Sequence, residues 1–148
     1  MKLITIRSKD LEKELIGYKF EVSKKDLVQV MDDKIILINK IPSFFYHEKK
    51  LVPTLKLLIQ KDLIPSVYVD QGAIKFVIKG ADIMRPGITD FDPEIKKGNF
   101  VVIKDSQHKK PLAVGISLST SEEVSKLKTG IILRNLHFLG DDLWKISL

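Results

Sequence analysis

Hydrophobic and polar residues alternate in short runs along the second half of the chain, a pattern typical of many short strands. The runs predicted to form strands are 74–78, 88–91, 100–103, 112–118, 131–133, 138–139 and 143–146. Strands at this close spacing, separated by glycine, proline and polar turns, indicate a small barrel or sandwich. The last two runs are expected to pair as a terminal hairpin, and a short capped helix is expected to begin near Ser119 or Ser121.

The first half mixes helical and strand periods. Apolar residues at helical spacing predict helices over 8–17 and 51–59, and apolar runs predict strands over 27–30, 35–38 and 43–47. We therefore predict an α+β fold with two domains, a small α+β domain at residues 1–71 and a small barrel or sandwich at residues 72–148. Residues 66–71 are expected to link the two domains.

A strand is predicted at the start of the segment 72–93, which organises the second half. Ile74, Phe76 and Ile78 alternate with the intervening residues 75, 77 and 79, two of which are lysines. This two-residue period is that of a half-buried strand. The alternation stops at the glycine at position 80, so the strand is expected to end there.

A tight turn is predicted to follow. Residues 81–85 are too few for a helix of ordinary length and fit a single helical turn. Pro86 ends that turn, because proline disfavours helical backbone in the residue before it. Gly87 is expected to adopt positive φ and to lead the chain into the strand at 88–91.

The turn also carries a family resemblance. Residues 80–87, Gly-Ala-Asp-Ile-Met-Arg-Pro-Gly, resemble the signature turn of PUA domains, small pseudobarrels that generally bind structured RNA. Further similar segments lie at 53–58, 70–77, 135–139 and 143–144. In this order and spacing they resemble the malignant T-cell-amplified sequence and ligatin family of translation re-initiation proteins, in which a pre-PUA domain precedes a PUA domain.

The resemblance implies a fold, a function and partners. It implies a pre-PUA α+β domain followed by a PUA β-pseudobarrel. It also implies that the protein acts on the small ribosomal subunit with tRNA during initiation, re-initiation or recycling. The implied partners are tRNA or rRNA and a protein with an initiation-factor-like domain. Two alternatives remain open: an accessory subunit that presents RNA to a tRNA- or rRNA-modifying enzyme, and a protein-interaction module that binds no RNA.

The resemblance also implies that the turn, the adjoining strand and the terminal strands form the RNA face. Small Gly80 and Ala81 would let a ribose–phosphate backbone approach, and N–H groups at the start of a helical turn attract phosphate. Arg85 would supply a planar guanidinium fork for phosphate or a base edge. The predicted RNA-binding residues are Lys79, Gly80, Ala81, Asp82, Met84, Arg85, Pro86, Gly87, Lys96, Lys97, Lys109, Lys110, Arg134 and His137. Solvated loops are the alternative explanation for the lysine pairs, and core packing is the alternative for Met84.

Composition supports a globular, non-catalytic protein. Hydrophobic residues make up 44% and charged residues 30% of the chain, and no apolar run approaches the ~20 residues of a membrane span. The chain has no cysteine, which excludes disulfides and cysteine chemistry and fits a cytoplasmic protein. A formal net charge of +6 favours polyanionic partners.

Motifs for catalysis are missing. The sequence contains no glycine-rich phosphate motif and no nucleophile elbow, and its histidines lie far apart. Asp90, Asp92 and Glu94 alternate as hard-cation ligands can, but they fit a solvated turn around Pro93 equally. We therefore predict no enzymatic activity, no cofactor and no metal.

Overall fold

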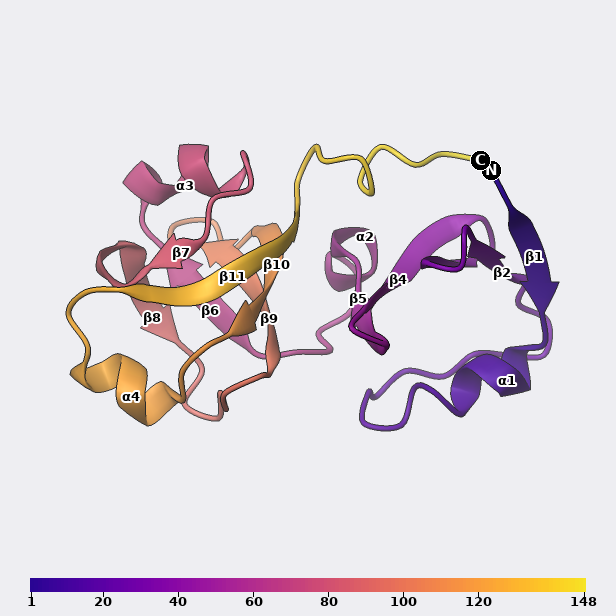
Figure 1. Cartoon of the computed structure of the whole chain (residues 1–148), viewed down its shortest axis with the longest axis horizontal. Coiled ribbons are helices and arrows are strands. Elements are labelled where there is room, and N and C mark those ends of the chain that lie inside the picture. The colour runs from indigo at the N-terminus through magenta and orange to yellow at the C-terminus, as the bar shows by residue number, and fades with distance from the viewer. The chain divides into compact units, whose positions relative to one another are not determined.

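The computed structural model describes residues 1–148, and the chain divides into two units (Figure 1). Unit 1 comprises Met1–Leu63 together with Asp142–Leu148, and unit 2 comprises Ile64–Asp141. The division therefore differs from the boundary expected at residue 71. Residues 66–71 do not form a linker, because Ser66–Val69 is a strand in the sheet of unit 2 and Gln71 begins a helix.

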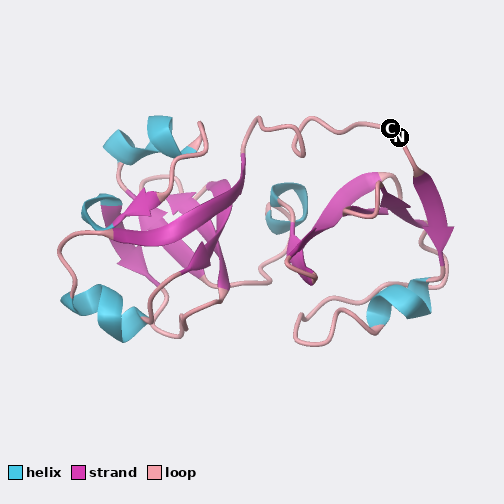
Figure 2. Ribbon diagram, viewed as in Figure 1, coloured by secondary structure: helices cyan, strands magenta, loops and turns pink.

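Unit 1 is built on a five-stranded antiparallel sheet (Figure 2). In spatial order its strands are β1 (Leu3–Ile6), β2 (Val28–Met31), β3 (Ile35–Ile38), β4 (Ile41–His47) and β5 (Lys50–Pro53). Its helices are α1 (Ser8–Glu12) and α2 (Leu55–Leu58). Two consecutive residues at positive φ make each of the turns at 32–33, 39–40 and 48–49, as tight hairpins with right-handed strand twist require. The core gathers around the fully buried Phe44 and Leu11.

Two expected elements of unit 1 are wrong in their bounds. The helix expected at 51–59 begins only after Thr54, because the preceding residues pair with β4. The Thr54 side chain caps this helix by accepting a hydrogen bond from Leu57 N. Ile59, one of the apolar residues whose spacing predicted this helix, is 53% exposed. The helix expected at 8–17 ends at Glu12, and no side chain caps its first turn.

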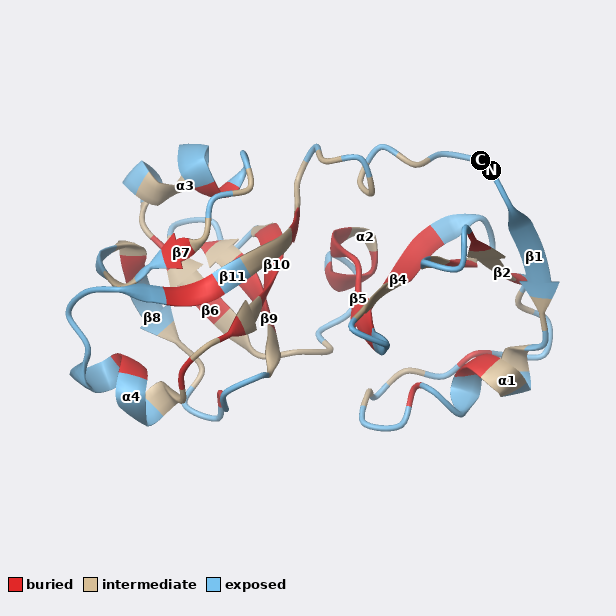
Figure 3. Ribbon diagram, viewed as in Figure 1, coloured by how far each residue is buried: buried red, intermediate tan, exposed pale blue.

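Unit 2 is built on a six-stranded, barrel-like sheet. Its spatial order is β7 (Ile83–Met84), β11 (Ile131–Phe138), β10 (Pro111–Ser117), β9 (Phe100–Asp105), β6 (Ser66–Val69) and β8 (Ile88–Phe91). The helices are α3 (Gln71–Val77), a 3-10 turn η1 (Arg85–Gly87) and α4 (Ser121–Lys126). The inner faces of β9, β10 and β11 form its core (Figure 3), and these strands are antiparallel neighbours. The predicted fold class, an α+β domain followed by a pseudobarrel, is confirmed.

The strand predicted at 74–78 is wrong, because this segment forms α3. The Asp70 carboxylate accepts a hydrogen bond from Ala73 N at 3.0 Å, which caps the first turn of the helix. Ala73, Ile74 and Val77 face the core, whereas Phe76 is 57% exposed. The alternation seen in the sequence therefore does not separate inward from outward side chains.

The turn after α3 also differs from the prediction. The helical turn expected at 81–85 lies at 85–87, and Ile83–Met84 instead pairs with β11 as β7. Gly87 does not adopt positive φ, whereas Gly80 does, at +93°. The helix expected near Ser119 or Ser121 is capped by Thr120, whose hydroxyl accepts from Glu123 N in a reciprocal capping box.

The terminal hairpin is absent, because no strand follows β11 and residues 142–148 join unit 1. Within that unit the ammonium group of Lys56 lies 5.3 Å from the centre of the Trp144 ring and donates to the carbonyl oxygen of Ile146 at 3.2 Å. No helix in the structure combines the length and the apolar character that crossing a bilayer requires.

Candidate nucleic-acid interface

The turn that follows α3 is fastened to β11 by two polar side chains. Asp82 Oδ1 accepts a hydrogen bond from Asn135 N at 3.0 Å. The Asn135 amide in turn donates to the carbonyl oxygens of Val77 and Ala81, each at 3.0 Å. The predicted RNA contact Asp82 therefore has a structural task, which is to fix the path of residues 77–82.

Gly80 is required by packing and by backbone conformation. A Cβ atom at this position would lie 2.9 Å from Phe138 Cε1, and φ is +93°. The N–H groups of Gly80 and Ala81 donate to carbonyl oxygens of α3, so they end a helix and do not begin one. The expected phosphate site at these N–H groups is therefore wrong.

Arg85 is engaged within the fold. Its Nε donates to the carbonyl oxygens of Val124 at 2.8 Å and Leu127 at 3.1 Å, where α4 ends, and Nη1 donates to Ile88 O at 3.2 Å. The guanidinium group also lies 5.8 Å from the centre of the Phe91 ring. A cation at the carboxyl end of a helix satisfies carbonyl groups that have no partner inside the helix. Arg85 thus stabilises η1 against α4, in contrast to the free fork that was expected.

An apolar groove of about 590 Å³ lies between α3 and the turn. We call it the apolar groove; its lining residues are Asp70, Gly72, Ala73, Phe76, Val77, Ala81, Asp82, Ile83, Met84, Pro86 and Gly87. Phe76 and Met84 contribute exposed side chains, 57% and 48% accessible. Five of the predicted residues therefore come together around one recess, namely Ala81, Asp82, Met84, Pro86 and Gly87.

Sequence reasoning missed Phe76, because the period-2 pattern assigned it to the core face of a strand. Asp70 was the signal for the correct assignment, since an aspartate whose carboxylate can accept from the N–H group three residues later is typical of a helix start. With α3 in place, Phe76 becomes the largest exposed apolar side chain that lines the groove.

A basic loop, residues 106–110, is tied to the amino-terminal end of α3. Asp105 Oδ1 accepts hydrogen bonds from the Gln71 amide at 2.9 Å and from Gln107 N at 2.7 Å. Burial opposes ionisation of Asp105, but the N–H groups of Gln107 and His108 and the Gln71 amide outweigh it and lower the pKa of the carboxyl group. The loop therefore holds an anionic anchor at its base.

The lysines of this loop remain exposed. Lys109, at φ 58°, places its ammonium group 4.4 Å from the centre of the Tyr68 ring, and Lys110 follows it. Because Gln71 contacts Asp105 and Gly72 lines the apolar groove, the basic loop lies next to one end of that groove.

The remaining predicted residues lie elsewhere on unit 2. Lys96 and Lys97 belong to a loop fastened to the start of α4, where Ser121 Oγ donates to Pro93 O at 2.6 Å. Lys79 is exposed after α3, and Arg134 is exposed on β11. His137 is only 1% exposed and its Nδ1 lies 2.8 Å from Asp141 Oδ2, so the expectation that it contacts RNA is wrong.

Comparisons with known proteins agree with this architecture. Residues 65–139 match the PUA domain family, and residues 8–61 match a domain of unknown function, DUF1947, which is the pre-PUA domain. An uncharacterized protein of Methanocaldococcus jannaschii is 42% identical over 85% of this chain and 80% of its own length. Translation machinery-associated protein 20 of Saccharomyces cerevisiae is 35% identical over 86% of this chain and 76% of its own length. Malignant T-cell-amplified sequence 1 of Rattus norvegicus is 35% identical over 84% and 74%.

The chain belongs to the malignant T-cell-amplified sequence family. Solved structures agree with this family assignment. A hypothetical protein of Pyrococcus horikoshii aligns with a TM-score of 0.84 and 28% identity over 99% of this chain and 100% of that chain. A chain of an H/ACA RNP bound to a substrate RNA aligns with a TM-score of 0.52 and 27% identity over 66% of this chain and 31% of that chain. The PUA domain points to RNA binding without catalysis, and the family members named after the translation machinery point to translation.

Proposed function

We propose that this protein binds structured RNA, either tRNA or small-subunit rRNA, in the cytoplasm during translation initiation, re-initiation or recycling, and that it catalyses no reaction. The observation that carries the proposal is the apolar groove with exposed Phe76 and Met84, next to a lysine-bearing loop, within a PUA domain. The family relationship supports a partner protein with an initiation-factor-like domain.

The groove suits an unpaired nucleotide better than a duplex. Proteins read RNA mainly at loops and ends, where unstacked bases can leave the helix and lie against aromatic side chains. Phe76 offers such a ring, and Met84 offers a flexible apolar contact next to it in the groove. Stacking of one base on an aromatic side chain contributes about 1–3 kcal/mol.

The basic loop supplies the charge that the groove lacks. Lys109 and Lys110 can contact phosphates on either side of an unpaired nucleotide without reading its base. Because Asp105 and Tyr68 fix the loop, its lysines lose less conformational entropy on binding than lysines of a free loop. The lysine pair would thus set affinity, while the groove would favour an unstacked base.

Titration of tRNA at two salt concentrations tests the proposal. We expect the association constant of the wild-type protein to fall steeply with salt, and the double substitution Lys109→Gln, Lys110→Gln to reduce the slope by about 0.7–0.9 for each lost contact. The matched control is Lys49→Gln, Lys50→Gln, which also removes two lysines from a hairpin turn whose first lysine has positive φ. Equal slopes for the two double variants would contradict the proposal.

A second function is favoured by one observation, the similarity to a chain of an H/ACA RNP bound to RNA. It would make this protein an accessory subunit that presents RNA to a modifying enzyme. Purification of the tagged protein at low salt separates the two functions, because the first predicts small ribosomal subunits in the eluate and the second predicts a modifying enzyme.

A further inference from the structure

A second recess lies in unit 1, which contains none of the residues assigned to RNA. It is enclosed by the connection from α1 to β2, residues 13–27, which contains neither helix nor strand. Ordered connections longer than about 12–15 residues without secondary structure are uncommon in small domains and are usually functional. The construction of this connection therefore bears on what it does.

The connection is well anchored on the core of unit 1. Leu15 and Val22 are buried at 3% and 4% exposure. The Tyr18 hydroxyl donates to the carbonyl oxygen of Leu51 at 2.6 Å, and the ring of Phe20 packs edge-on against Phe44 at 5.4 Å between centroids. A shape fixed at four points along its length presents a preformed surface, which reduces the entropy lost when a partner binds.

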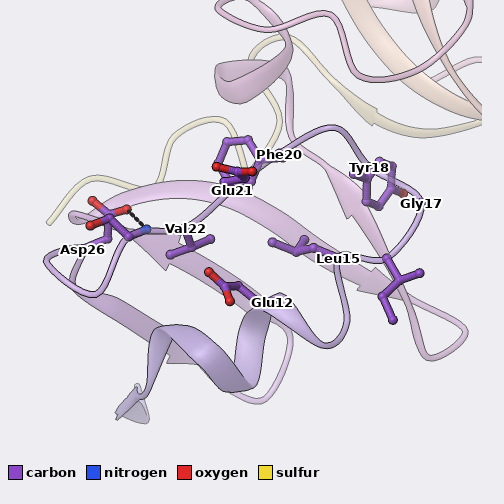
Figure 4. Close-up of a pocket in the computed structure, with 10 residues that line it drawn as sticks. Glu12, Leu15, Gly17, Tyr18, Phe20, Glu21, Val22 and Asp26 are labelled. Atoms are coloured by element: carbon purple, nitrogen blue, oxygen red, sulfur yellow. Dashed lines mark hydrogen bonds between the residues drawn. The ribbon is translucent and has the colours of Figure 1, made fainter.

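The recess that this connection encloses measures about 530 Å³, within the range of ligand sites. We call it the acidic recess; its lining residues are Glu12, Leu15, Ile16, Gly17, Tyr18, Phe20, Glu21, Val22, Ser23 and Asp26. In the view of Figure 4 the side chains of Leu15 and Val22 lie between the carboxylates of Glu12 and Glu21. The recess thus combines an apolar floor with a rim of carboxylates.

Every charged residue of the lining is acidic, although the chain has a formal net charge of +6. Asp26 is committed to the fold, since its carboxylate accepts from Ser23 N and from the Asn39 amide. The Glu12 and Glu21 carboxylates make neither a hydrogen bond nor an ion pair within the chain. These two groups are therefore available to a cationic partner.

The lining distinguishes between classes of partner. It disfavours RNA, because carboxylates repel phosphates. It also disfavours a metal ion, since no three histidine or acidic residues of the chain are grouped to coordinate one. Arginine and lysine side chains join an apolar stem to a charged head, so their stems suit the floor and their heads suit the rim. Ile16, 85% exposed, adds an apolar contact for a neighbouring side chain.

We propose that the acidic recess binds a segment of a partner protein that carries arginine or lysine next to an apolar residue. The arginine or lysine head groups pair with Glu12 and Glu21, and the apolar residue packs against Ile16. This interaction is separate from RNA binding by unit 2, so either can fail in experiment without the other.

A fluorescent peptide of alternating leucine and arginine is the probe, and the same peptide with glutamate in place of arginine is the control. We expect saturable binding of the arginine peptide to the full chain, with amide chemical shift changes confined to residues 12–26 and their contacts. Loss of two exposed ion pairs in the variant Glu12→Gln, Glu21→Gln should weaken binding about threefold to tenfold.

The matched variant is Glu48→Gln, Glu94→Gln, which removes the same charge at exposed positions outside the recess. It should bind the arginine peptide within about twofold of the wild type, since the screened attraction of distant charges is weak. The proposal is overturned if the arginine peptide does not saturate, if both double variants lose affinity equally, or if the glutamate peptide binds as well.

Discussion

The apolar groove of unit 2 and the acidic recess of unit 1 have similar volumes but use their charged residues in opposite ways. Around the apolar groove, Asp82 and Arg85 are hydrogen-bonded inside the fold, and the exposed side chains are Phe76 and Met84. In the acidic recess Glu12 and Glu21 have no partner in the chain. A charged residue whose hydrogen bonds are used inside the fold is thus a weaker candidate for binding, however distinctive its motif.

The largest expected effect concerns Arg85. Replacing it with alanine leaves the carbonyl oxygens of Val124 and Leu127 without their donor, and we expect a loss of about 2–3 kcal/mol in the unfolding free energy of unit 2. Guanidinium unfolding followed by circular dichroism should shift, while the fluorescence of Trp144, the one tryptophan and part of unit 1, should report an unchanged transition. The exposed Arg134→Ala is the control, at under about 0.5 kcal/mol.

The next effect compares the exposed apolar residues of the two recesses. Phe76→Ala should weaken tRNA binding about tenfold, because base–aromatic stacking is worth about 1–3 kcal/mol. Ile16→Ala removes an even more exposed apolar group, from the acidic recess, and should leave tRNA affinity unchanged. Fluorescence anisotropy with labelled tRNA measures both, and a loss of similar size in the two variants would erase the distinction between the recesses.

A pair of glycines gives a smaller contrast. Gly80 and Gly17 have similar backbone conformations, with φ of +93° and +103°, but a Cβ atom would meet Phe138 only at Gly80. Both substitutions to alanine carry the cost of positive φ, of about 1 kcal/mol. Gly80→Ala should cost roughly 1 kcal/mol more, as expected for overpacking. Thermal unfolding of the two variants measures the difference, and equal costs would show that Phe138 moves aside freely.

The last contrast is the alkaline stability of unit 1. Burial raises the pKa of Tyr18 to about 12, and burial together with the hydrogen bond to Glu14 raises the pKa of Tyr46 to about 12. Since the ordinary value is 10.0, the unfolded chain loses these protons first. The stability that the neutral phenols contribute is fully present below pH 10 and falls as the pH rises toward 12. Trp144 fluorescence in denaturant should show this decline, and Tyr18→Phe should flatten it.

The order of the elements could be predicted largely from the sequence, because strand runs such as 112–118 and the turn around Asp32 and Asp33 are specified locally. The two-domain α+β architecture followed from the same patterns and the signature turn. Short elements were less secure. The segment 71–77 has both a two-residue and a helical apolar period, and the choice depends on the Asp70 cap and on which side chains the barrel buries.

The role of Arg85 could not be predicted, because its acceptors on Val124 and Leu127 lie 39 and 42 positions away along the chain. The same holds for Lys56 and Ile146, separated by 90 positions. His137 is a polar residue that lies buried on β11, beside Asp141 four positions further along the chain. The contacts of Arg85 and Lys56 exist only after distant segments have come together, and local patterns carry no information about them.

The position of residues 142–148 in unit 1 has a consequence for biosynthesis. Translation produces unit 2 between two parts of unit 1, so the segment that contacts Lys56 is made only after unit 2. At about 5–20 amino acids per second, the ribosome needs on the order of 4–16 s to pass through the intervening residues. During that interval the nascent unit 1 lacks residues 142–148. Unit 2 is therefore complete before unit 1, although its synthesis begins later.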